Sequence, residues 1–296
     1  LDEGKNIEPL ELKNNSISQL MADTYRSSGA IPIIGPFTFP FGESRVIGGG
    51  TFINGGLLWK TPEKTLNNWK NLIPNSVFTS NTWHETENKV EKDLGVSLCS
   101  DHLNGENEGS NLLRESSKNL GWKVVSVPRA VYGCKNLNRC AAGCPIGAKQ
   151  DVRFNYLKKA LNNGSILRES SKVIKIEKLN GQPKKVIYKN KKNYHHAYFK
   201  NLIISAGATQ SPLLLRKNKL SKSAGNYFQF HLNFKVLANF NRPINAERGT
   251  IFTHQVQEFE DEGILMMTTN FQFPFLLSTL SSQPDKIARH FLKNYD

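Results

Sequence analysis

The chain has 296 residues, of which 38% are hydrophobic and 10% aromatic, and its 39 Lys and Arg residues against 25 Asp and Glu give a net charge of +14. This apolar content excludes an intrinsically disordered protein, and the length allows one large domain or two interwoven ones. No apolar run is long enough to span a bilayer and no signal peptide is visible, so the compartment stays open.

Local patterns along the chain predict a mixture of helices and strands. Thr61, Pro62 and Glu63 form a helix start, and Gly121 ends a second helix. The predicted segments are, in chain order, a strand end at 1–4, helices at 62–70, 110–120 and 152–161, a hairpin of strands 172–178 and 185–188 around the turn 180–183, a short apolar strand at 202–205, and strands at 232–240, 251–257 and 264–271. The last three predict a largely antiparallel sheet in a second domain.

Two segments are rich in glycine and alanine where a strand or turn is expected. The first, which we call the glycine loop, covers residues 45–56 and reads Arg-Val-Ile-Gly-Gly-Gly-Thr-Phe-Ile-Asn-Gly-Gly. The second covers residues 202–212 and reads Leu-Ile-Ile-Ser-Ala-Gly-Ala-Thr-Gln-Ser-Pro. Backbone without bulky side chains can approach a flat or charged group closely. Together the two segments predict one cofactor held by distant parts of the chain.

Three cysteines, Cys134, Cys140 and Cys144, lie within eleven residues, and Pro145 follows the last. Such compact runs hold iron–sulfur clusters, and three ligands would suit a 3Fe-4S cluster. A disulfide or reduced structural thiols are also compatible with the spacing, and we favour them over a cluster because spacing alone cannot settle metal binding. Cys99 stands apart and is expected in the core.

The positive charge is mostly scattered Lys, with small clusters at Lys184–Lys185 and Lys189–Lys192. These clusters fall near an expected hairpin turn and lack interleaved aromatic residues. Nucleic-acid binding requires clustered charge on one face, so we expect a solvated surface and no nucleic-acid partner.

Residues 49–56 resemble the Gly-Gly-Ser/Thr-x-x-Asn-Gly loop of the glucose–methanol–choline (GMC) flavin oxidoreductases, and residues 205–215 resemble the second signature of that family. The segment 143–150 is similar to a bacterial branch of its alcohol dehydrogenases, and a like cysteine spacing occurs in sugar dehydrogenase subunits with a three-iron cluster. Residues 225–231 match a third family segment ending in His231, but Tyr227 and Phe230 replace its usual Asn and Asp.

The resemblance implies FAD as cofactor and assigns positions to it. Asp2 matches the acid that binds the adenosine ribose, with Glu3 as its neighbouring alternative, and Val173 matches the strand position at adenine. Asn54 would lie near the flavin edge, or else serve as a turn residue. The other expected cofactor contacts are Gly49, Gly50, Thr51, Gly55, Ala206, Gly207 and Ala208.

The implied fold is α/β, with a Rossmann-like FAD-binding domain at 1–60 and 150–230 and an interleaved substrate domain at 61–149 and 231–296. The first βα unit of the family, with its Gly-x-Gly-x-x-Gly turn, has no counterpart here, and the chain opens on Leu1. The family's catalytic His lies farther toward the C-terminus than residue 296. We therefore expect an internal fragment that is inactive alone and assign none of its histidines as the base.

The resemblance implies an oxidoreductase that oxidises the CH–OH group of an alcohol or sugar and passes hydride to flavin N5. Phe271, Phe273 and Phe275 alternate like a strand face that could line an apolar substrate pocket or belong to the core. The electron acceptor is open among oxygen, quinone and cytochrome. The alternative is a non-catalytic iron–sulfur electron-transfer or binding protein built around the three clustered cysteines.

Overall fold

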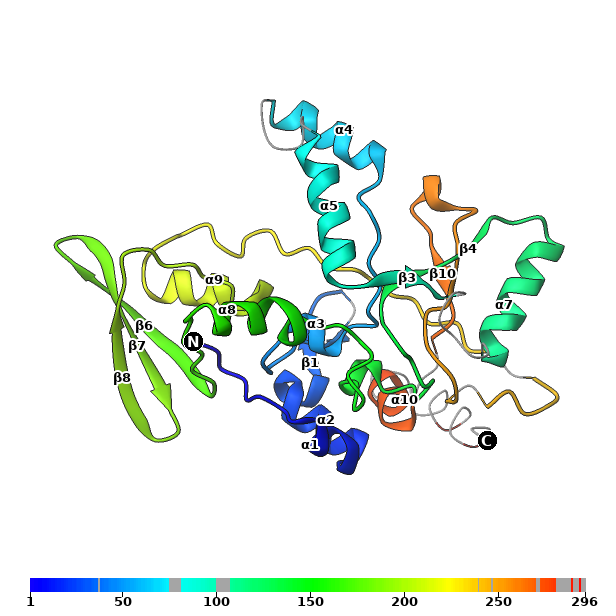
Figure 1. The fold of residues 1–296 in the computed structure, drawn as a ribbon, viewed down its shortest axis with the longest axis horizontal. Coiled ribbons are helices and arrows are strands. Elements are labelled where there is room, and N and C mark those ends of the chain that lie inside the picture. The colour runs from blue at the N-terminus through cyan, green and yellow to red at the C-terminus, as the bar shows by residue number, and fades with distance from the viewer. Residues whose placement is uncertain are drawn as a thin grey trace.

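The computed structural model describes residues 1–280 except 37, 75–80, 100–106, 239, 246 and 270–271, together with 289 and 293. The three-stranded sheet of residues 171–198 lies at one end of the molecule (Figure 1). Helices α4 and α5 project from the middle of the molecule (Figure 1). Helix α7 lies at the opposite end, beside strands β4, β9 and β10 (Figure 1). The glycine loop and the cysteine segment lie in the body between these parts.

The body is built on short N-terminal elements: α1 (Pro9–Asn14), α2 (Ile17–Thr24), η1 (Arg26–Gly29), the paired strands β1 (Ile31–Ile33) and β2 (Phe39–Phe41), and α3 (Gly50–Ile53). Ser16 caps α2 by accepting the backbone N–H of Gln19. The core cluster here joins this region to the cysteine segment, and its buried members are Ile7, Leu12, Leu20, Val46, Phe52 and Ala142.

The projecting helices are α4 (Glu63–Leu72) and α5 (Thr82–Asp93), and Trp69 and Trp83 pack edge to face between them at 5.9 Å. The predicted helix at 62–70 is thus confirmed. The predicted helix at 110–120 is also confirmed as α7 (Glu108–Asn119), which Asn107 caps from its side chain. The third predicted helix, 152–161, is one π-helical turn, η4 (Arg153–Leu157), followed by α8 (Lys158–Asn162).

The strand pairs of the described residues are all antiparallel. Strands β3 (Val96–Leu98) and β5 (Pro128–Ala130) pair, and a separate sheet has the order β10 (Met266–Met267), β9 (His254–Val256), β4 (Val124–Ser126). Short connecting turns are η3 (Cys140–Ala142) and η5 (Glu260–Glu262).

The fourth sheet of the described residues has the order β6 (Ser171–Leu179), β7 (Gln182–Asn190), β8 (Asn193–Tyr198). Its first turn uses Asn180 and Gly181, both at positive φ, which confirms the predicted hairpin. The third strand, β8, has no counterpart among the predicted strands. Helix α9 (Gly207–Lys217) lies against this sheet, where the Asn218 side chain accepts the backbone N–H of Ile176 at 2.8 Å.

Several predicted strands are wrong. Residues 1–4 form no strand ladder, and residues 202–205 and the described part of 232–240 are not strands, because no described strand lies beside them to complete their hydrogen bonds. The predicted strand at 264–271 is reduced to β10, and Phe273 and Phe275 lie on a helix, α10 (Phe273–Leu280). Phe271 lies outside the described residues.

The structure therefore mixes helices with small antiparallel sheets. Parallel pairing within the described residues is limited to the single bridge between Lys5 and Val46, so the Rossmann-like half and the domain boundaries stay predictions. No helix among the described residues has both the length and the apolar character needed to cross a membrane.

Candidate functional site

The glycine loop turns at two glycines in the left-handed region, Gly48 at φ 97° and Gly49 at φ 55°. Other residues rarely adopt these angles, so the backbone itself requires glycine at both positions. Helix α3 then starts at Gly50. The Thr51 hydroxyl donates to the Gly48 carbonyl at 2.6 Å and accepts the Val152 backbone N–H at 3.2 Å, which fixes the loop to the segment after the cysteines.

Gly50 is a glycine that the protein's own packing does not explain. Its φ is not positive, and a Cβ built on it would meet no described atom within 4 Å. By contrast, a Cβ on Gly48 would lie 3.2 Å from Arg153 Cγ, and one on Gly55 would lie 2.5 Å from the Phe252 ring. Gly50 therefore leaves bare backbone open to a bound group, whereas Gly55 is already covered by protein.

Asn54 is exposed, and its Oδ1 accepts the backbone N–H of Gly56 at 3.0 Å. This is the local hydrogen bond of an Asx turn, so the structure supports the turn role that the sequence left open for this residue. The exposed side chain lies beside the bare backbone of the loop and remains available to a bound group.

Lys149 is a site residue that sequence reasoning missed. Its side chain is 1% exposed, and its ammonium donates to the carbonyls of Phe52 at 2.5 Å, Asn54 at 2.8 Å and Cys140 at 2.8 Å. Burial lowers its pKa to about 8, because the charged form loses its hydration. One cation thus ties the end of the glycine loop to the cysteine segment.

A second buried cation, Arg129, was also missed. Its guanidinium is 0% exposed and donates twice to the Gly55 carbonyl, and also to the Thr250 hydroxyl, the Ile251 carbonyl and Cys140 Sγ, the last at 3.4 Å. All five N–H groups of an Arg are then used, without a carboxylate among their acceptors. No spacing signal in the sequence pairs Arg129 with residues 121 and 122 positions away.

The cysteines are all free thiols, which excludes a disulfide among them in this structure. Cys99 is fully buried, as expected, and burial raises its pKa to about 11. Within the described residues no group of three His, Cys, Asp or Glu side chains could hold a metal ion. Cys140 instead receives a hydrogen bond from the Arg129 guanidinium. The iron–sulfur hypothesis for Cys134, Cys140 and Cys144 therefore has no support here.

The second segment, at Ala206, Gly207 and Ala208, starts helix α9. Gly207 has φ 87°, and a Cβ on it would lie 3.1 Å from Glu43 Oε1. The Thr209 hydroxyl donates to both carboxylate oxygens of Glu43, at 2.7 and 2.8 Å. The turn therefore needs glycine, and Glu43 holds the start of α9.

Glu43 also brings the two glycine-rich segments together. Its neighbour Ser44 lies beside the glycine loop, because a Cβ built on Gly49 would be 4.0 Å from Ser44 Oγ. Consecutive residues thus border Gly49 and Gly207. Gly49 and Gly207 therefore lie near the same two residues, Glu43 and Ser44.

Asp2 and Val173, the positions predicted to bind the adenosine end, lie near each other at the base of the hairpin. The backbone N–H of Ser171 donates to the Asp2 carbonyl at 2.7 Å, and Asp2 Oδ1 accepts the Gly4 N–H at 2.7 Å. Burial raises the pKa of Asp2, and the Gly4 hydrogen bond opposes this. Val173 is half-buried in β6. Glu3 is already paired with Arg26 at 3.0 Å.

A cavity of about 390 Å³ opens beside the end of the glycine loop. The glycine loop contributes Ile53 and Gly55 to its wall, and the cysteine segment contributes Ala141. Most of the remaining wall is apolar, and it includes Phe252 and Phe275. The predicted pocket role of Phe275 is compatible with this position, although the residue lies on a helix instead of a strand.

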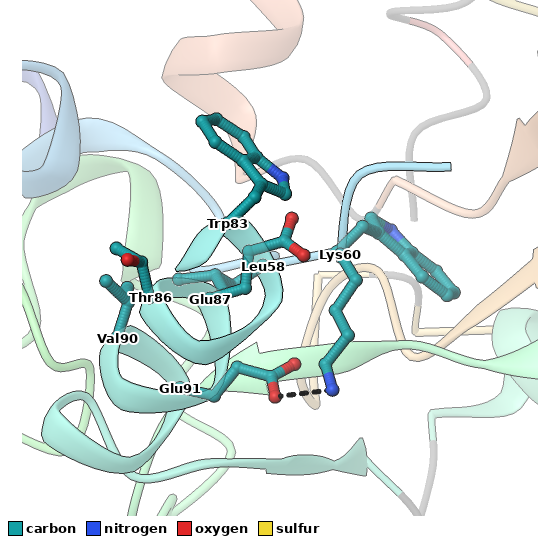
Figure 2. Close-up of a pocket in the computed structure, with 8 residues that line it drawn as sticks. Leu58, Lys60, Trp83, Thr86, Glu87, Val90 and Glu91 are labelled. Atoms are coloured by element: carbon teal, nitrogen blue, oxygen red, sulfur yellow. Dashed lines mark ion pairs between the residues drawn. The ribbon is translucent and has the colours of Figure 1, made fainter. Parts of the chain in front are cut away.

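A second cavity, of about 250 Å³, lies between residues 58–60 and helix α5. Figure 2 shows Trp83 and Val90 on its wall and the Lys60 side chain reaching Glu91, with which it pairs at 3.3 Å. None of the predicted site residues lines it, so it is separate from the glycine-loop site. His231, the histidine of the third family segment, is exposed and lines neither cavity.

Comparison with known proteins gives several relatives of one kind. An uncharacterized GMC-type oxidoreductase of Sinorhizobium fredii is 28% identical over 267 residues, covering 88% of this chain and 52% of that protein. One of Mycobacterium tuberculosis is 26% identical over 274 residues, covering 91% and 43%. A long-chain-alcohol oxidase of Arabidopsis thaliana is 28% identical over 212 residues, covering 69% and 28%. The chain spans about half the length of the first two.

Among solved structures, pyridoxine 4-oxidase from "Mesorbium loti" is similar with a TM-score of 0.48 and 14% identity, covering 73% of this chain and 46% of that one. The sequence profile of the GMC oxidoreductases matches residues 21–233, a range that contains both glycine-rich segments, the cysteines and His231. With more than two thirds of its residues inside that range, the chain belongs to the GMC oxidoreductase family.

Proposed function

We propose that this chain carries the FAD-binding loops of an oxidoreductase that acts on the CH–OH group of an alcohol or a sugar. The observation that carries the proposal is Gly50, whose backbone is bare although neither its φ nor any described neighbour requires glycine. The family assignment and the alcohol oxidase among the relatives support the reaction class.

The residues present fit the cofactor. Gly50 would face the pyrophosphate and the flavin ring with its open backbone. Gly49 and Thr51, whose backbone N–H groups donate to the carbonyls of Val46 and Gly48, would shape the loop around the same group. Asn54 would offer its side-chain amide at the flavin edge, and Gly207 would bring the start of α9 close to the same group. Ala206 and Ala208 would leave that approach free of bulky side chains.

The adenosine end would lie at the base of the hairpin, where Asp2 would bind the ribose and Val173 would meet the adenine. When bound, FAD supplies the acceptor for the hydride that leaves the substrate carbon. The apolar wall of the 390 Å³ cavity would exclude water from this transfer. Lys149 and Arg129 would keep the loop carbonyls fixed and pointed away from the cofactor.

The test compares two glycines whose Cβ positions are both in open space. Gly50→Ala should leave the free energy of unfolding unchanged or raise it by about 0.5 kcal/mol, yet weaken FAD binding about 10-fold through overpacking. Gly164→Ala should do the opposite, because Gly164 has φ 86° and Ala is strained there, by about 1 kcal/mol. FAD binding is measured by quenching of flavin fluorescence during titration.

If the wild-type chain leaves flavin fluorescence unchanged, or if Gly50→Ala binds FAD as tightly as the wild type, the proposed loop contact is wrong. We further expect the 296-residue chain to bind FAD without oxidising alcohols, because none of its described histidines lines the 390 Å³ cavity. Anaerobic bleaching of the flavin absorbance by an added alcohol would contradict that expectation.

A further inference from the structure

The segment 171–200, which contains the β6–β7–β8 sheet, carries more than half of the net charge of the chain. Residues 171–200 contain nine Lys and one Glu, a net charge of +8 out of the total of +14. The one acid, Glu177, is held by Lys175 at 2.8 Å and by Lys185, and these contacts lower its pKa to about 2. Glu177 is therefore ionised throughout the neutral range, and the segment keeps its net charge of +8 with this acid counted.

The register of the strands sorts these side chains onto two faces. Residues directly opposite each other point to the same side of a sheet, and β7 pairs Lys185 with Tyr198, Ile187 with His196 and Lys189 with Tyr194. The opposite side carries the buried residues Ile176, Val186 and Tyr188. We call the first side the outer face; on β7 and β8 it consists of Lys185, Ile187, Lys189, Tyr194, His196 and Tyr198.

The outer face combines exposed rings with Lys189 and with the lysines of the turn that follows it. Tyr194 and Tyr198 are each 65% exposed. Lys189 Nζ lies 5.9 Å from the centre of the Tyr194 ring, and the His196 and Tyr198 rings are 5.5 Å apart. Of the two lysines on this face of β7 and β8, Lys185 pairs with Glu177, and Lys189 has no ion pair among the described residues. Lys191 and Lys192 lie in the turn between β7 and β8, beside Lys189 and Tyr194.

This arrangement differs from the solvated, purely basic surface that the sequence predicts. The Lys clusters at 184–185 and 189–192 lack interleaved aromatics along the chain, which is why no nucleic-acid partner is expected from the sequence. Strand β8, absent from the predicted strands, places Tyr194, His196 and Tyr198 beside those clusters in space. Aromatic and basic side chains are interleaved across strands instead of along one strand.

We propose that the outer face binds single-stranded nucleic acid, with its rings stacking on bases and its lysines contacting phosphates. A flat sheet face with exposed rings suits unstacked bases, which every sequence offers. It does not suit a duplex, whose major groove admits a helix or a narrow ribbon. A lipid surface is disfavoured because the rings of this face are Tyr and His, and its one aliphatic side chain, Ile187, is half-buried.

The test is fluorescence anisotropy of a labelled oligothymidylate of about 15 nucleotides, titrated with the whole chain. Tyr194→Ala/Tyr198→Ala should weaken binding about 10-fold per tyrosine. Tyr194→Phe/Tyr198→Phe keeps the rings and should bind like the wild type. The matched control is Tyr132→Ala/Tyr227→Ala, at tyrosines that are 79% and 93% exposed elsewhere, and it should also bind like the wild type.

The charge part of the proposal has its own readout. Lys189→Gln/Lys192→Gln should reduce the slope of log affinity against log salt concentration by about 0.7 for each phosphate that the variant no longer neutralises. Equal affinity for a duplex of the same length, or tyrosine variants without effect, would show a general polyanion site and overturn the proposal. Binding to phosphatidylserine vesicles without binding to the oligonucleotide would overturn it in favour of a membrane surface.

Discussion

Two buried cations hold the candidate site in shape, and neither has a carboxylate as its direct partner. Lys149 donates to three carbonyls and Arg129 to three carbonyl or hydroxyl oxygens and one sulfur. A buried charge costs free energy unless its hydrogen bonds are complete, so both side chains are committed to these acceptors. The carbonyls of Phe52, Asn54 and Gly55 are thereby held in place by these buried hydrogen bonds.

Lys149 should make stability depend on pH in a predictable direction. Its pKa is about 8 in the folded protein and 10.5 for an ordinary Lys, so between these values the unfolded chain binds more protons. The free energy of unfolding therefore rises with pH across this window, by up to about 3 kcal/mol, and the burial cost is fully present below pH 8. Urea unfolding of the wild type at several pH values measures it.

The rise must be assigned to Lys149 by comparison, because other groups titrate in the same range. In Lys149→Met this contribution is absent, so the stability of the wild type relative to the variant should increase from pH 8 to 10.5. Lys64→Met, at a side chain that is 77% exposed, should run parallel to the wild type. A constant difference between the wild type and Lys149→Met over this range would show that Lys149 titrates normally.

Single residues of the site could be predicted from the sequence where the backbone conformation requires glycine. Gly49 and Gly207 are predicted as special positions, and both have positive φ. The roles of Lys149 and Arg129 could not be predicted, because their acceptors are carbonyl groups that every residue carries. Only the folded arrangement shows which carbonyls they meet.

Among the elements, a chain of four charged side chains and one hydroxyl connects five segments. Lys172 on β6 pairs with Glu3, Glu3 with Arg26, and Arg26 with Glu43, which accepts the hydroxyl of Thr209 at the start of α9. The Arg26 and Glu43 side chains are 17% and 10% exposed. This network, and not a strand ladder, positions α9 against the glycine loop.

Glu43→Gln keeps the size of the side chain but removes its charge. It should lower the free energy of unfolding by about 1–2 kcal/mol, because the partly buried Arg26 loses a charged partner. It should also weaken FAD binding, since the start of α9 is held by the same carboxylate. Chemical unfolding and flavin titration measure the two effects.

Glu115→Gln is the matched control, because Glu115 is 57% exposed and pairs with its neighbour Arg114 on the surface. This change should cost less than about 0.5 kcal/mol. If Glu43→Gln is as mild as the control, the network does not position α9.

The helices and the hairpin that were predicted correctly have a capping or turn residue within the element or next to it. Asn107 caps α7 and Gly121 follows it in the left-handed region, and Asn180–Gly181 makes the turn of the hairpin. The strands that were predicted wrongly would need a pairing strand from elsewhere in the chain. Residues 202–205 have a strand-like sequence but no neighbouring strand among the described residues. Helix α10 was mistaken for a strand because the spacing of Phe273 and Phe275 outweighed Pro274, which suits a first helical turn.

Over the whole molecule, packing and charge are distributed unevenly. The buried cluster around Phe52 and the fully buried Arg129 lie in the body, whereas most of β8 is exposed at one end (Figure 1). Composition and length predicted a folded protein with helices and strands, and the motifs predicted its family. The pairing of β3 with β5 and of β4 with β9 could not be predicted, because these strands lie far apart in the sequence.

This uneven packing should appear in hydrogen exchange. Backbone amides of residues 127–131 and 52–54 are expected to exchange slowest, because opening them breaks the hydrogen bonds of Arg129 and Lys149 together. Amides of β8 are expected to exchange fastest among the strands of its sheet. Both β6 and β8 are edge strands, but β6 also donates to the Asn218 side chain after α9, and most of β8 is exposed. Mass spectrometry of deuterated peptides measures both, and slower exchange in β8 than in 127–131 would contradict this distribution.

Arg129 also constrains how the polypeptide can assemble. Its guanidinium needs Gly55, which precedes it, and Thr250 and Ile251, which the ribosome adds more than a hundred residues later. During synthesis the first half of the chain cannot close around this side chain without leaving donors unmatched. We therefore expect the interior around Arg129 to be completed only when Thr250 and Ile251 reach it.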